Sequence, residues 1–138
     1  MFKSKLKKPI RNVTAIIYDK RGRVLSIGKN SYTKTHTMQS YYAHRVGLPC
    51  KQYLHAEIDA IIRCKDLSKA HTIFVARVDK SGSYRMAKPC KVCQCAIDAT
   101  GIENIIWTTN NDGEVGMIGR PVTDIGKIGK RRRLFQSN

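Results

Sequence analysis

The sequence predicts an α/β fold, with a mixed β-sheet of about five strands that is covered by helices and starts with a β-hairpin. Apolar runs rich in β-branched residues alternate with helical patterns in the order β-β-α-β-α-β, which is typical of this class. The chain has 138 residues, of which 41% are hydrophobic, enough for one packed core. We therefore expect a single domain over residues 1–138.

The hairpin is predicted from the two apolar runs at residues 13–19 and 24–30, which flank the polar turn Lys-Arg-Gly-Arg. Residues 31–54 follow without a clean period. A structureless segment of that length is unusual in a compact domain and suggests a functional loop. We expect it to form a wall of the site.

The second half of the chain alternates helices and strands. A helix is predicted at residues 55–64, a buried strand at 72–79 and a second helix at 91–100, which Gly101 ends as a C′ glycine. A strand at 103–109 follows. The segment after Thr109 returns as an antiparallel strand or begins a loop, and the sequence leaves its direction open.

Basic residues outnumber acidic ones by 26 to 10, a formal net charge of +16 that is concentrated towards the two ends. Residues 1–11 and 127–138 contain ten of the lysines and arginines, and the remainder has 16 basic against 10 acidic residues, or +6. Basic clusters attract polyanions such as nucleic acid by counterion release, and solvated tails are an equally good interpretation.

No run approaches the roughly 20 apolar residues of a membrane span, and the opening residues lack the apolar stretch of an export signal. In such a chain five cysteines, an odd number, indicate reduced thiols and metal ligands rather than disulfides. We expect a soluble, cytoplasmic protein.

Two short motifs are candidates for chemistry: His-Ala-Glu at residues 55–57 and Pro-Cys-Lys-Val-Cys at residues 89–93. Each falls at the predicted start of a helix, with one strand between them. A lone His-x-Glu occurs by chance, and a lone Cys-x-x-Cys fits a zinc ribbon, a redox pair or buried thiols. Their combination, in this order and with proline before the first cysteine, is the signature of zinc-dependent deaminases.

On these motifs the sequence resembles the cytidine and deoxycytidylate deaminase superfamily, over roughly residues 13–109. HAEIDAI is similar to the first zinc motif and PCKVCQCAIDATGIENIIW to the second with its following strand. The resemblance implies a three-layer-type cytidine deaminase-like fold and a hydrolase that removes the amino group of a cytosine-type base. Because Ile-Gly-Lys-Asn at residues 27–30 resembles a substrate-contacting segment, it also implies that Asn30 and the backbone of Ala56 hold the base.

The donor chemistry supports one catalytic zinc ion per chain. Two thiolates, from Cys90 and Cys93, and the imidazole of His55 balance the charge of Zn²⁺ and leave a fourth position for water. The dipole of the helix that begins at the cysteines favours their thiolate forms. Glu57, which is not a ligand, would take a proton from the water and pass it to the ring nitrogen and then to the leaving ammonia.

Alternatives to this zinc assignment remain. The motif residues could be ordinary helix-start residues beside a structural site, although a closed site needs four protein ligands and the sequence has no second Cys-x-x-Cys. Cys64 and Cys95 are interpreted as buried small apolar residues. Cys50 with His36 or His44 could bind a second, structural zinc, but an ordinary loop thiol is the more frequent outcome.

The leading hypothesis for the substrate is CMP, dCMP or a related pyrimidine nucleotide or nucleoside, over which the long loop could close. The rival is a deaminase of cytosine or adenine in single-stranded DNA or RNA. The basic ends would suit such a substrate, and so would a group of loop tyrosines whose rings can stack on bases: Tyr32, Tyr41, Tyr42 and Tyr53. A third hypothesis is a catalytically silent nucleic-acid-binding relative, against which the intact Glu57 argues.

Two further expectations follow from the resemblance. Met86-Ala87-Lys88 stands before Pro89 where many relatives have a threonine and an acidic residue. Lys88 could meet a substrate phosphate, although a solvated lysine is the commoner outcome. Relatives are commonly oligomers, and we expect a homo-oligomer.

Overall fold

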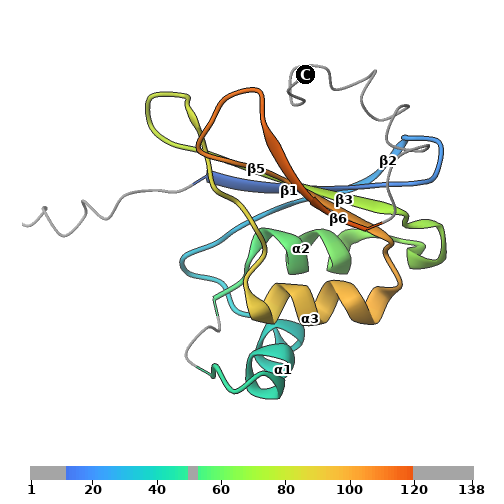
Figure 1. The fold of residues 1–138 in the computed structure, drawn as a ribbon. Coiled ribbons are helices and arrows are strands. Elements are labelled where there is room, and N and C mark those ends of the chain that lie inside the picture. Colours follow the sequence, from blue (N-terminus) through green and yellow to red (C-terminus); the bar gives the residue numbers. More distant parts are fainter. Residues whose placement is uncertain (1–11, 50–52, 120–138) are drawn as a thin grey trace, which may run out of the picture.

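The computed structural model describes residues 12–49 and 53–119. None of the helices in these two stretches is long and apolar enough to cross a bilayer. Figure 1 shows the arrangement of the helices and strands. Their bounds, in chain order, are β1 (Asn12–Tyr18), β2 (Val24–Lys29), α1 (Thr37–Arg45), α2 (Ala56–Arg63), the short 3-10 helix η2 (Leu67–Lys69), β3 (Thr72–Val78), β4 (Tyr84–Arg85), α3 (Lys91–Thr100), β5 (Asn104–Thr108) and β6 (Val115–Ile118).

The strands form one mixed six-stranded sheet in the order β2-β1-β3-β5-β6, with β4 paired to β3. β3 and β5 are parallel and every other pair is antiparallel. The parallel pair is connected through α3, as a crossover requires, whereas the short turn after β5 allows only an antiparallel return. The predicted mixed sheet with its opening hairpin is confirmed, and the direction left open after Thr109 is antiparallel.

The turn of the β1–β2 hairpin is built by an aspartate and a glycine. Asp19 Oδ1 accepts hydrogen bonds from the backbone N–H groups of Arg21 and Arg23, each at 2.9 Å, as short polar side chains often do in turns. Gly22 has a φ of +85°, in the left-handed region that glycine adopts without steric cost. The turn between β1 and β2 could therefore be predicted from the local sequence.

α2 and α3 lie on one face of the sheet, and their N-terminal ends are at the same edge as the carboxyl ends of β3 and β5 (Figure 1). Aliphatic side chains with no solvent exposure fill the space between the layers. Burying one such side chain contributes about 1.5–3 kcal/mol. The largest of them are Ile17, Ile58, Ile73, Ile97, Val75 and Val92.

The contact between β2 and α2 is close because β2 has a glycine at that point. A Cβ at Gly28 would overlap the backbone of Ala56 and Ala60. The Ser26 hydroxyl donates a 2.8 Å hydrogen bond to the Ala60 carbonyl across the same contact. The start of α2 is thus fixed against the sheet.

The expectation of an irregular segment over residues 31–54 was wrong in its centre, where α1 lies. The two side chains that α1 buries are Gln39 and Ala43, one polar and one small, so no apolar stripe marks the helix. Its N-cap is His36, whose Nδ1 accepts a 3.0 Å hydrogen bond from Met38 N, and histidine is not among the usual cap residues. α1 packs against α3. The two ends of the segment 31–54, on either side of α1, contribute to the pocket described below.

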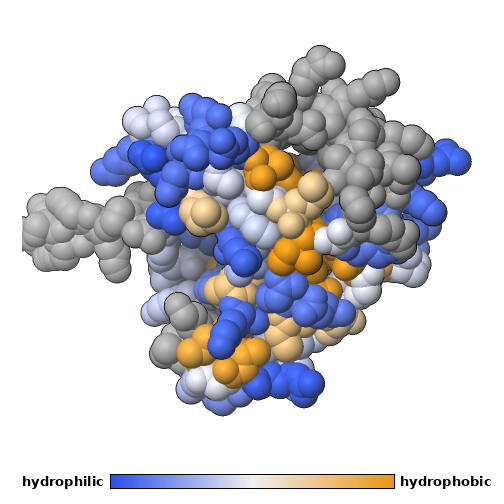
Figure 2. All heavy atoms as spheres, in the orientation of Figure 1, coloured by the Kyte–Doolittle hydropathy of each residue, from blue (hydrophilic) through white to orange (hydrophobic). Residues whose placement is uncertain are grey.

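The other face of the sheet carries a smaller apolar cluster of Tyr18, Phe74 and Ile106. In Figure 1 the described helices all lie on the opposite side. Figure 2 shows apolar side chains over β6, where Met117 is 45% and Ile118 43% exposed. β6 is therefore an apolar strand at the edge of the sheet in the part of the chain that the structure describes.

Candidate metal centre and pocket

The first part of the site is the N-terminus of α2. His55 is the N-cap residue of α2. Its backbone is extended, with φ −89° and ψ 156°, so the residue lies just before the first helical turn. Its backbone N–H donates a 3.0 Å hydrogen bond to Oε1 of Gln39, which is completely buried in α1. The buried amide of Gln39 therefore fixes the residue on which the metal site depends.

The second part is the N-terminus of α3. Cys90 is the N-cap residue there and is half-buried, and Cys93 lies one turn into the helix and is fully buried. Residues three apart lie on the same side of a helix, so both thiols can face one point. Because α2 and α3 start at the same edge of the sheet, that point is also next to His55.

These three residues form the group that could hold a metal ion, with ligand atoms all within 4.8 Å of one another. His55 Nδ1 is 3.3 Å from Cys93 Sγ and 3.6 Å from Cys90 Sγ. Tetrahedral zinc, with bonds of about 2.0 Å to nitrogen and 2.3 Å to sulfur, would hold such atoms about 3.5 Å apart. The donor types and their spacing thus fit a zinc ion with three protein ligands.

Hydrogen bonds distribute charge unequally between the two thiols. The hydrogen bond with the Cys93 thiol, helped by His55 and the α3 backbone, lowers the pKa of Cys90 to about 3. The same hydrogen bond, together with burial, raises the pKa of Cys93 well above its usual value. The ionised thiolate is the form of cysteine that binds metals.

Glu57 lies in the first turn of α2 and is 6% exposed. Burial raises the pKa of its carboxyl, and the neighbouring His55 opposes that rise. Its carboxyl is within hydrogen-bonding reach of the Cys93 thiol. A carboxyl with a raised pKa beside a metal site is suited to accept and release protons near neutral pH.

A pocket of about 530 Å³ opens beside this centre. Volumes of roughly 300–1,000 Å³ are usual for small-ligand sites. The side-chain oxygen of Asn30 accepts a 3.1 Å hydrogen bond from Val13 N, which fixes the amide at the pocket wall. The predicted site residues in its lining are Asn30, His55, Ala56, Glu57 and Cys90.

Other predicted residues lie in different places. Of the four loop tyrosines, Tyr32 and Tyr53 line the pocket, 46% and 55% exposed. Tyr41 and Tyr42 instead form an edge-on ring pair on α1, with centroids 4.8 Å apart. Half of the predicted stacking surface therefore lies at the pocket.

The three remaining cysteines, Cys50, Cys64 and Cys95, differ in their burial and in whether the structure describes them. Cys64 is buried as expected, whereas Cys95 is only partly buried. Cys50 lies outside the described residues, so the second zinc site stays a prediction. The Nδ1 atom of each histidine proposed for that site contacts the backbone of α1 instead. His36 Nδ1 accepts a hydrogen bond from Met38 N, and His44 Nδ1 lies 2.9 Å from Ser40 O.

Sequence reasoning missed Gln39, Arg77 and Met86. Arg77 and Met86 line the pocket from β3 and from the segment before Pro89, and Gln39 supports His55 from α1. None belongs to a motif. Only the inward-facing alternation along β3 could have indicated Arg77, which shares its face with Val75.

The comparisons with known proteins agree with this geometry. The family model described as the cytidine and deoxycytidylate deaminase zinc-binding region matches residues 1–109. No curated protein matches the chain.

Proposed function

The chain belongs to the cytidine and deoxycytidylate deaminase family of zinc hydrolases, and we propose that it deaminates the cytosine-type base of CMP, dCMP or a related pyrimidine nucleotide. The products are the uracil compound and ammonia. Family membership implies a nucleoside or nucleotide substrate. The pocket of about 530 Å³ beside a His-Cys-Cys centre is the observation that supports a small nucleotide.

His55, Cys90 and Cys93 are the proposed zinc ligands. They fit the ion because His55 Nδ1 lies 3.3 Å and 3.6 Å from the two sulfurs, all three ligand atoms lie within 4.8 Å of one another, and the described group contains no fourth protein donor. When bound, zinc supplies a water whose pKa is lowered to about 7 and that can attack C4 of the base. One catalytic ion per chain is the proposed stoichiometry.

Glu57 is the proposed acid and base. Its buried carboxylate takes the proton that the attacking water loses and delivers it to N3 of the ring. It then transfers the second proton of the water to the exocyclic nitrogen, so that the C4–N bond breaks and ammonia leaves. The raised pKa of Glu57 makes its carboxylate a stronger base for taking the proton from the water.

Asn30 and the backbone of Ala56 are the proposed contacts to the substrate. Both line the pocket, Asn30 from the end of β2 and Ala56 from the first residue of α2. The hydrogen bond between Val13 and Asn30 holds the amide in place before substrate enters. Such preorganisation reduces the entropy lost on binding.

A second candidate function is deamination within a single-stranded polynucleotide. The observation that favours it is the exposure of Tyr32 and Tyr53 at the mouth of the pocket, where rings could stack on neighbouring bases. Intact Glu57 beside the centre argues against a silent binding module in either case.

The test is ammonia release from a panel of cytosine, cytidine, CMP, dCMP, dCTP and oligonucleotides that contain cytosine. We expect turnover of at least one mononucleotide by the full chain with zinc bound. Turnover of oligonucleotides alone would replace the first proposal with the second. No release from any compound, with about one zinc per chain and a folded protein, would refute both.

A further inference from the structure

The mouth of the pocket carries two cationic side chains, Arg77 and Lys88. Among the residues that the structure describes, the lining contains one carboxylate, that of Glu57, and this group is buried at the metal centre. The two cations therefore give the entrance a net positive charge. A concave site lined by one sign of charge concentrates ligands of the opposite sign.

Neither cation is neutralised by a carboxylate within residues 12–49 and 53–119. Three other arginines in these stretches form ion pairs: Arg23 with Asp19 at 3.0 Å, Arg63 with Asp59 at 3.0 Å, and Arg85 with Asp79 at 2.8 Å. Three of the five other arginines in the described stretches thus have an aspartate beside them, whereas the pair at the pocket has none. That difference points to an anion supplied by the ligand.

The contacts recorded for the two side chains leave donors for such an anion. Arg77 Nη1 gives one long hydrogen bond of 3.4 Å to the Met86 carbonyl, from a guanidinium that has five N–H donors. Lys88 Nζ lies 5.5 Å from the centroid of the Trp107 ring, a cation–π contact that steadies the ammonium without cancelling its charge.

The backbone that carries both residues is fixed. Thr108 accepts at Oγ1 from Arg77 N at 3.1 Å and donates from the same hydroxyl to the Arg85 carbonyl at 2.7 Å. Ala87 N donates to the Thr108 carbonyl at 3.0 Å.

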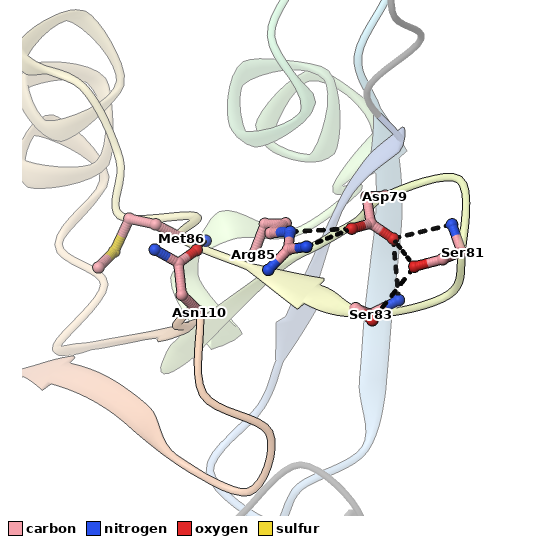
Figure 3. A network of polar contacts seen from close by, with 6 residues as sticks. All are labelled: Asp79, Ser81, Ser83, Arg85, Met86 and Asn110. Atoms are coloured by element: carbon pink, nitrogen blue, oxygen red, sulfur yellow. Dashed lines mark hydrogen bonds and ion pairs between the residues drawn. The ribbon is translucent and has the colours of Figure 1, made fainter.

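Side chains fix the same wall from the outside. Figure 3 shows Asn110 accepting from Met86 N, at 3.0 Å, beside the ion pair between Arg85 and Asp79. The wall is therefore positioned before a ligand binds, which lowers the entropy cost of binding.

We propose that Arg77 and Lys88 form an anion subsite that takes a phosphate group of the substrate, so that the enzyme acts on phosphorylated pyrimidines in preference to nucleosides and free bases. This inference rests on the proposed deaminase function and names the residues that set its substrate class. The guanidinium suits a phosphate because its fork of N–H groups can bind two oxygens, and the ammonium adds a point charge.

The phosphate could be the terminal group of a mononucleotide or a phosphodiester of a single strand. Binding of reaction products separates these sources and does not depend on turnover. The probes are uridine, UMP and a nine-nucleotide strand with one central deoxyuridine, titrated by calorimetry into the full chain loaded with zinc. Arg77→Gln and Lys88→Gln are the test variants, and Lys80→Gln, an exposed turn residue outside the pocket lining, is the matched control.

We expect UMP to bind at least tenfold more tightly than uridine. Each test variant should reduce that preference about tenfold to a hundredfold, the usual range for a hydrogen bond to a charged group, with the affinity for uridine unchanged. Lys80→Gln should keep the full preference. If only the strand binds, and the same two variants weaken it, the phosphate is a phosphodiester.

Equal affinity for UMP and uridine, with no binding of the strand, would overturn the subsite, as would test variants that weaken uridine as much as UMP. Lys88 is exposed, so Lys88→Gln keeps the test valid if Arg77→Gln does not fold. A phosphate preference that both variants abolish, without ammonia release from any cytosine compound, would refute the proposed deamination and leave the subsite standing.

Discussion

Replacing Gln39 by methionine removes a buried hydrogen-bond acceptor and nearly preserves the volume of the side chain. Gln39 is completely buried, and its Oε1 accepts the backbone N–H of His55 at 3.0 Å. Methionine cannot accept that bond in its place, so the N–H of His55 loses its partner where α2 begins. A buried donor without a partner costs about 1–3 kcal/mol.

The expected result is a loss of about 1–3 kcal/mol in the free energy of unfolding, together with weaker zinc binding because the position of His55 is no longer held. Urea titration of the zinc-loaded protein measures the first effect and competition with a chelator the second. Gln94→Met is the control, since Gln94 makes its 2.9 Å bond to Asp98 on the exposed side of α3. Its effect should stay within about 0.5 kcal/mol.

Gln39→Met with the stability and zinc affinity of the parent would refute the role assigned to Gln39. Equal losses in Gln39→Met and Gln94→Met would also do so, because a general loss of glutamine amides would then explain both.

Three other changes test the fold and the centre. Gly28→Ala places a Cβ against the backbone of α2, so urea titration should show a loss of about 1–3 kcal/mol, and an unchanged midpoint would contradict the close contact. Cys93→Ala should lower bound zinc from about one per chain, measured by atomic emission, and lower Tm; full zinc content would exclude Cys93 as a ligand. A hydrogen bond from Ser81, with others from the same turn, lowers the pKa of Asp79 to about 2, below the unfolded value of about 3.9. Its carboxylate therefore stabilises the fold above about pH 4 and loses that effect as the pH falls towards 2. The Tm of Asp79→Asn should accordingly lie below that of the parent above about pH 4, and the difference should narrow as the pH falls towards 2. A difference that stays constant would contradict this.

The parts of the fold that the sequence predicted are those with a local cause. β1 and β2 are β-branched runs around a turn with a left-handed glycine, and α3 ends at Gly101, whose φ is +85°. The metal centre could be predicted because His-x-Glu and Pro-Cys-x-x-Cys each lie at the start of a helix, and their combination in this order is the signature of zinc-dependent deaminases.

What the sequence could not predict depends on tertiary contacts. α1 buries Gln39, a polar residue whose hydrogen-bond partner His55 lies 16 positions away in the sequence. No periodic pattern of apolar residues therefore predicts this helix. The two-residue strand β4 pairs with β3, and Thr108 and Asn110, which follow α3 in the chain, bind the backbone of Arg85 and Met86. Arg77 lines the pocket from β3, on the same face as Val75, and belongs to no motif.

Zinc content and ammonia release, measured on one preparation of Glu57→Gln, test the proposed chemistry most directly. The amide has the shape of the carboxylate and cannot shuttle a proton, so the variant should keep the fold and about one zinc per chain. Its turnover of the best substrate should fall by about 10²–10⁴-fold or more. Glu114→Gln, an exposed turn position, should match the parent. Turnover of Glu57→Gln within about tenfold of the parent, at equal zinc content, would contradict the assignment of Glu57 as the acid and base.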